Sequence, residues 1–144
     1  MTTIATDGLT MAADGRVTGG GFIHSDDQPK LFRLSDGRIV GIAGSLYNQT
    51  TFLKWLEGGE ADDLSLDEEF EGLVLHRDGR VQTYNCRGKS AFMKPPVVAG
   101  SGGVFAAVAM DAGCSPEDAV RHAMKRDCAS GGTITAMTRE LPAK

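Results

Sequence analysis

The chain opens with the stretch MTTIATDGLTMAAD, residues 1–14, and this stretch sets the pattern of the first half of the sequence. Two β-prone runs, 3–6 and 10–13, flank Asp7-Gly8, a dipeptide typical of a tight hairpin turn. Thr2 stands directly behind Met1, which aminopeptidases readily remove before a small side chain. A Thr hydroxyl becomes a good nucleophile when an adjacent N-terminal amine takes its proton. Thr2 is therefore a candidate nucleophile, although many ordinary proteins also begin Met-Thr.

The rest of the chain reads as strands, a helix, more strands, a helix pair and a last strand. Asp-Gly recurs at residues 14, 36 and 78, and each copy predicts a turn between strands. This order predicts an α+β domain spanning residues 1–144, with helices packed on a largely antiparallel sheet. We expect strands at 3–6, 10–13, 17–23, 31–34, 39–43, 73–76, 81–84, 97–99 and 133–138, and helices at 46–56, at 102–112 and from the N-cap Ser115 onward.

The composition excludes several classes of protein. Charged residues make up 24% of the 144 residues and the net charge is −4, whereas a nucleic-acid-binding protein usually carries a basic stripe. No apolar run is long enough to span a membrane, and the start lacks the pattern of a signal peptide, so we expect a cytoplasmic protein without a membrane partner. Eight acidic residues and no Lys or Arg lie between Glu57 and Glu71. We interpret this segment as a solvated loop rather than a docking site for a basic partner.

The cysteines and histidines do not form a metal-binding pattern. Cys86, Cys114 and Cys128 are odd in number and lack C-x-x-C spacing, which indicates reduced thiols of a cytosolic protein. The three histidines lie far apart in the sequence. We therefore expect neither a metal nor an organic cofactor.

Several ordered motifs resemble the proteasome β-subunit family and its bacterial HslV-type relatives, which are N-terminal nucleophile hydrolases. The matches run nearly from end to end of the chain. The intervals between the matched residues also agree with the family, because Asp14 precedes Lys30 by 16 residues and Lys30 precedes Gly44 by 14. The segments that carry the resemblance are the start at 2–4, the strand 11–15 ending in an Asp, the Lys-bearing segment 30–34, the Ala-Gly turn at 42–45, the glycine-serine turn at 100–103 and the late motif Asp-x-x-Ser-Gly at 127–131.

The resemblance implies a role for each matched residue. Thr2 would be the nucleophile, Lys30 would favour its deprotonation, and Asp14 would hold Lys30 charged and oriented. The Gly44 N–H would donate to the oxyanion. Ser101, Asp127 and Ser130 would position the Thr2 amine. Val17, Ile42 and Leu46 would form an apolar substrate pocket.

The resemblance also implies a fold and partners. The family fold is a four-layer αββα sandwich, and here the interval after Gly59 leaves room for no more than a much shortened second helix. We expect a homo-oligomeric ring that cleaves peptides or unfolded protein. An ATP-dependent unfoldase is a further expected partner, which the shortening of this helix puts in question.

Other interpretations remain open at this stage. The chain could hydrolyse small amides, or it could be a catalytically silent assembly subunit. Individually, Asp14 could serve a turn, Lys30 could be an exposed lysine, and the turn 100–103 could bind a phosphate at a helix N-terminus, although it lacks the ending of a P-loop. Asp127 and Ser130 could cap a helix, or form a serine triad with a histidine, although no nucleophile-elbow motif is present.

Overall fold

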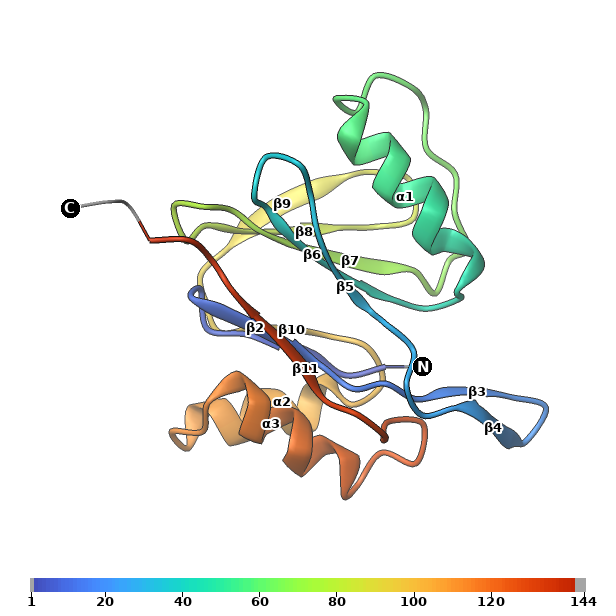
Figure 1. Ribbon diagram of the computed structural model, residues 1–144, viewed down its shortest axis with the longest axis vertical. Helices are drawn as coiled ribbons and strands as arrows, with labels where there is room; N and C mark the ends of the chain where they lie inside the picture. Colours follow the sequence, from blue (N-terminus) through green and yellow to red (C-terminus); the bar gives the residue numbers. More distant parts are fainter. Residues whose placement is uncertain (1, 142–144) are drawn as a thin grey trace.

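The computed structural model describes residues 2–141 and shows four layers, with two antiparallel sheets between two layers of helix (Figure 1). One sheet has the strand order β10-β1-β2-β11, and the other has the order β5-β6-β7-β8-β9. This arrangement confirms the predicted αββα sandwich. The strands of the first sheet are β1 (Ile4–Thr6), β2 (Thr10–Ala13), β10 (Val97–Ala99) and β11 (Thr135–Thr138), and those of the second are β5 (Leu31–Arg33), β6 (Ile39–Ala43), β7 (Glu71–Leu75), β8 (Val81–Tyr84) and β9 (Ser90–Met93).

Alternating side chains on the strands build the three interfaces between the layers. Because successive residues of a strand point to opposite faces, Ile4 lies in the core between the two sheets, whereas Ala5 lies against the helix pair. Ile39 and Val40 divide in the same way between the inter-sheet core and the helix α1 (Tyr47–Glu57). The small alanines of β1 and β2 allow the helix pair to approach that sheet closely.

Helices α2 (Gly103–Asp111) and α3 (Pro116–Met124) form the layer below the first sheet. Ser115 is the N-cap of α3, as predicted, and its hydroxyl accepts a hydrogen bond from the Asp118 N–H at 3.2 Å. The run 102–112 is almost wholly apolar, which favours burial between layers, but the structure does not bury it there. Its helix α2 lies on the outside, and Val104 and Val108 are 70% and 64% exposed.

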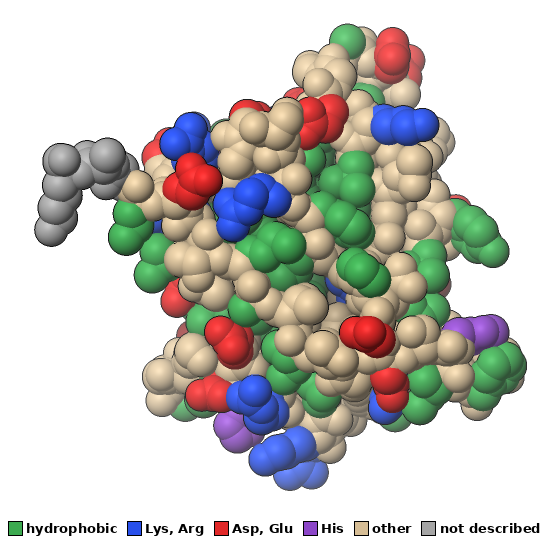
Figure 2. All heavy atoms as spheres, viewed as in Figure 1, with side chains coloured by type: hydrophobic (Ala, Val, Ile, Leu, Met, Phe, Trp, Pro, Cys, Tyr) green, Lys and Arg blue, Asp and Glu red, His purple; other side chains and the backbone are tan. Residues whose placement is uncertain are grey.

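Three other expectations also require correction. The predicted strand 17–23 is a hairpin of β3 (Val17–Gly19) and β4 (Phe22–Ser25), whose turn is Gly20-Gly21. Figure 1 shows this β3–β4 hairpin standing away from the sandwich, and Figure 2 shows hydrophobic side chains and a histidine at its tip. Strand β9 was not predicted, and residues 58–70 contain no helix, not even a short one.

The Asp-Gly pairs divide into two groups. Those at residues 7, 36 and 78 turn between neighbouring strands with a positive glycine φ, as predicted. The pair at Asp14 does not make a hairpin, because β2 and β3 belong to different sheets. The Asp14 side chain is instead free to point into the interior.

Candidate active site

Five of the predicted site residues or their neighbours adjoin the inter-sheet core. Each of these five residues directly precedes or follows a core residue in the sequence. They are Thr3, Asp14, Lys30, Gly44 and Gly100. These core residues are Ile4, Ala13, Leu31, Ala43 and Ala99, in that order. The close packing of the two sheets therefore holds segments that are distant in the sequence at one end of the sandwich.

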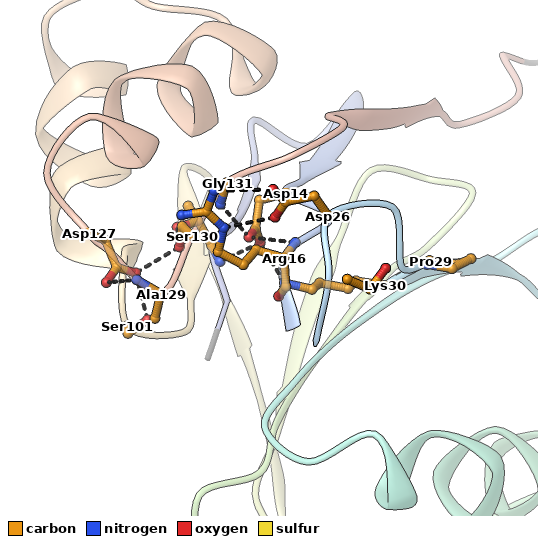
Figure 3. Close-up of polar contacts among 12 residues, drawn as sticks. Asp14, Arg16, Asp26, Pro29, Lys30, Ser101, Asp127, Ala129, Ser130 and Gly131 are labelled. Atoms are coloured by element: carbon orange, nitrogen blue, oxygen red, sulfur yellow. Dashed lines mark hydrogen bonds and ion pairs between the residues drawn. The ribbon is translucent and has the colours of Figure 1, made fainter. Parts of the chain in front are cut away.

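Asp14 and Lys30 form a buried ion pair. Lys30 Nζ lies 2.8 Å from Asp14 Oδ1, and the two side chains are 3% and 0% exposed (Figure 3). Asp14 accepts three further hydrogen bonds from backbone N–H groups, at 3.0 Å from Thr3, 3.2 Å from Arg16 and 3.0 Å from Gly131. Burial lowers the pKa of the Lys30 ammonium below its ordinary value, and the Asp14 carboxylate opposes that shift.

Asp127 is the centre of a second hydrogen-bond network. Its Oδ2 accepts from the Ser101 hydroxyl at 2.6 Å and from the Ser130 hydroxyl at 2.7 Å (Figure 3). Ser130 Oγ also lies 2.7 Å from Thr3 Oγ1. Because Ser130 gives its one proton to Asp127, Thr3 is the donor in this last bond. Burial alone would raise the pKa of the Asp127 carboxyl, but the two hydroxyl donors hold it below its ordinary value.

Thr2 lines a cleft of roughly 570 Å³ together with Lys30 and Gly44. Thr2 is 2% exposed, and Gly44 has a φ of +111°, a conformation that favours glycine. Val17, Ile42 and Leu46 also line this cleft. The remaining lining residues are Arg16, Thr18, His24, Ser45, Tyr47, Gln49 and Glu69. Figure 2 shows hydrophobic side chains gathered over the middle of one face, between the α1 layer and the helix pair.

The glycine-serine turn at 100–103 contacts the N-terminal segment. The Gly102 N–H donates to the Thr2 carbonyl oxygen at 3.2 Å. A side chain at Gly102 would overlap the Thr3 hydroxyl oxygen, so this close approach requires glycine. The turn therefore contacts the backbone of Thr2 directly.

The structure does not support a serine triad. Ser130 and Asp127 are bonded to each other, but the histidine contacts found within residues 2–141 lie elsewhere. His24 contacts the Gly19 carbonyl, and His76 contacts Gln82. No group of three or more His, Cys, Asp or Glu side chains in the described part of the chain is placed to hold a metal ion.

Sequence reasoning missed three residues of this region. Thr3 joins the Asp14 and Asp127 networks, and its position beside Thr2 was the one signal that could have drawn attention to it. Arg16 and Asp26 form an ion pair beside Asp14. Nothing in the local pattern around Asp26 distinguishes it from an exposed acidic residue. The predicted loss of Met1 concerns a residue outside the described range.

The comparisons with known proteins identify the fold. No protein-family model matches the sequence, and a search of curated proteins gives no match. Among solved structures, HslV from Trypanosoma brucei is similar with a TM-score of 0.74 and 20% sequence identity, over 94% of this chain and 97% of that chain. BPH from Thiobacillus denitrificans is similar with a TM-score of 0.73 and 16% identity, over 99% of each chain.

A structure of the same Thiobacillus denitrificans protein in complex with epoxomicin is also similar, with a TM-score of 0.70, 17% identity and 99% coverage of each chain. The chain therefore has the HslV and proteasome β-type fold, as its motifs predicted. At these identities the likeness establishes the fold alone. No helix within residues 2–141 has the length and apolar character needed to cross a lipid bilayer.

Proposed function

We propose that this chain is a threonine-type endopeptidase whose nucleophile is Thr2, made N-terminal by removal of Met1. The observation that carries the proposal is that the buried Lys30, paired with Asp14, lines a cleft together with Thr2 and Gly44. A buried cation beside a Thr hydroxyl stabilises the alkoxide, and so lowers the cost of deprotonating the nucleophile. The likeness in fold to HslV agrees with this proposal.

The proposed reaction needs only groups of this chain, the substrate and water. Thr2 Oγ attacks the carbonyl carbon of the scissile amide, and the Thr2 α-amine takes the hydroxyl proton. The Gly44 N–H stabilises the oxyanion. The C–N bond then breaks, the leaving amine receives the proton, and the acyl group remains on Thr2 as an ester. Water hydrolyses this ester and restores the free hydroxyl.

The rest of the site supports this assignment. Ser101, Asp127 and Ser130 hold the N-terminal segment through the Thr3 hydroxyl, which fixes the backbone that carries the Thr2 amine. Val17, Ile42 and Leu46 give the cleft apolar walls, so we propose cleavage after an apolar residue. We further propose that the enzyme acts in the cytoplasm as a homo-oligomeric ring on peptides or unfolded protein. An ATP-dependent unfoldase stays a prediction that this single chain does not test.

Intact mass spectrometry tests the proposal. The purified protein should lack Met1 and should gain the mass of one molecule of an electrophile directed at N-terminal threonine. Thr2→Ala should form no adduct. A variant with a non-removable N-terminal extension keeps the Thr2 hydroxyl but blocks its amine, and it should also be inert. Retained Met1 with no adduct, under conditions that allow processing, would exclude a hydrolase and favour a silent assembly subunit.

Substrate assays then separate peptidase from amidase. The wild type should cleave short peptides and a permanently unfolded protein, and Thr2→Ala should cleave neither. Activity on small amides without cleavage of any peptide would instead identify a small-amide hydrolase. Native mass spectrometry of the same preparation should show a closed homo-oligomer, and a monomer would contradict the proposed ring.

A further inference from the structure

A second ion pair, between Arg16 and Asp26, lies beside the Asp14–Lys30 pair (Figure 3). Arg16 Nε lies 2.8 Å from Asp26 Oδ1, and Arg16 Nη2 lies 3.2 Å from Asp26 Oδ2. This is the two-pronged geometry that makes Arg–carboxylate pairs strong and well oriented. Arg16 Nη1 also donates to the Cys128 carbonyl oxygen at 3.2 Å. The guanidinium thus bridges the segment before Lys30 and the loop after α3.

The backbone of Arg16 contacts both members of the buried pair. Its N–H donates to Asp14 Oδ2 at 3.2 Å. Its carbonyl oxygen accepts from Lys30 Nζ at 2.7 Å. A change in the orientation of the Arg16 backbone would therefore move a direct partner of the Lys30 ammonium.

The loop after α3 packs tightly on the same pair. Gly131 lies so close to the Arg16 guanidinium that a Cβ at this position would overlap it. The Thr133 N–H donates to the Asp26 carbonyl oxygen at 2.8 Å. Because Asp127 and Ser130 precede these contacts by a few residues, the Arg16–Asp26 pair supports their loop as well.

Exposure argues against a mainly stabilising role for this pair. The Arg16 and Asp26 side chains are 22% and 45% exposed, so solvent screens the pair and its contribution to stability should be modest despite the two-pronged geometry. The Arg38–Asp36 pair matches it in length and exposure, since its Nε–Oδ2 distance is also 2.8 Å and its side chains are 20% and 55% exposed, although it joins residues two positions apart through one side-chain hydrogen bond. The two pairs differ in their neighbours, because Arg16 lines the cleft and Arg38 is absent from its lining.

We propose that Arg16 and Asp26 are positioning residues of the active site. The pair clamps three segments together: the turn after β2 that carries Asp14, the segment 26–30 that ends in Lys30, and the loop that carries Asp127 and Ser130. It thereby holds the Lys30 ammonium and the Thr3-binding network in fixed relative positions for attack by Thr2. This inference rests on the proposed peptidase function.

A double-mutant cycle tests the clamp. We would measure kcat and KM for a peptide, and the rate of adduct formation at saturating electrophile, for Arg16→Ala, Asp26→Ala and the double variant. Each single variant should lose about 10-fold or more in kcat, because small displacements of catalytic groups are costly. The double variant should lose little more than either single variant, and melting temperatures should stay within about 3 °C of the wild type. Arg38→Ala and Asp36→Ala should leave kcat unchanged.

Several outcomes would overturn the clamp. One is an unchanged kcat in Arg16→Ala, and another is a change confined to KM, which would make Arg16 a substrate contact. Losses that multiply in the double variant would show that the two side chains act separately. If Arg16→Ala does not fold, Arg16→Lys keeps the charge without the two-pronged geometry and must show the same loss in kcat. A wild type that forms no adduct and cleaves no peptide would instead refute the proposed function, and the clamp with it.

Discussion

Replacing Asp14 by Asn tests how much the fold depends on the buried ion pair. The carboxylate receives four donors: Thr3 N–H and Lys30 Nζ on one oxygen, and Arg16 N–H and Gly131 N–H on the other. An amide of the same shape can accept on one side only. On its other side its NH₂ group would face donors, and the Lys30 ammonium would lose its counter-charge.

The expected cost follows from the burial of the pair. Because the Lys30 and Asp14 side chains are 3% and 0% exposed, water cannot replace the missing carboxylate. Removal of one partner of a buried ion pair costs about 3–5 kcal/mol. Domains have unfolding free energies of about 5–15 kcal/mol in all, so Asp14→Asn should lose a large share of its stability.

Urea unfolding at one fixed protein concentration measures this cost, with Asp78→Asn as the control. The Asp78–Arg80 pair has the same 2.8 Å separation but side chains that are 56% and 59% exposed, so its loss should cost no more than about 1 kcal/mol. Lys30→Met should cost less than Asp14→Asn, because Asp14 would keep its three backbone donors. An unfolding free energy of Asp14→Asn within about 1 kcal/mol of the wild type would refute this account of the site.

Two further predictions concern the Asp127 network. Gly102→Ala should lose about 1–3 kcal/mol in unfolding free energy, because its Cβ would displace the Thr3 hydroxyl. The control Gly58→Ala, at a helix end with a φ of −81°, should change the unfolding free energy by about 0.5 kcal/mol or less. Equal losses in the two variants would contradict the steric argument. The lowered pKa of Asp127 means that the folded state binds its proton more weakly than the unfolded state. Its contribution to stability is therefore present above the unfolded pKa of about 3.9 and is lost as the pH falls through the folded pKa. The difference in unfolding free energy between the wild type and Asp127→Asn should shrink on acidification, and a difference that grows instead would show that the carboxylate is not stabilised by folding.

Local pattern predicted much of the fold because it reports which face of each element is apolar. The β-prone runs of β1 and β6, the capping residues of α3 and three of the four Asp-Gly turns are all properties of neighbouring residues. The same reasoning failed where tertiary packing decides. Periodicity alone could not show that α2 lies on the outer layer, nor that β3 and β4 leave the sandwich as a separate hairpin.

The candidate site divides along the same line. The motifs and their order indicated Thr2, Asp14, Lys30, Gly44, Ser101, Asp127 and Ser130 as candidates, and the structure brings these residues to one end of the sandwich. The residues that connect them were not evident. Thr3 meets Ser130 across 127 positions of sequence, and Arg16 meets Asp26 across the β3–β4 hairpin, which the sequence pattern had indicated as a single strand.

The sequence by itself thus determined most of the elements and the types of residue available for the chemistry, because these depend on neighbours along the chain. The tertiary structure decided which of these residues share an environment. Only the packing of the two sheets buries Lys30 against Asp14, and only the return of the loop after α3 brings Ser130 to Thr3. The lowered pKa of Lys30 follows from that burial, since exclusion of water disfavours its charged form.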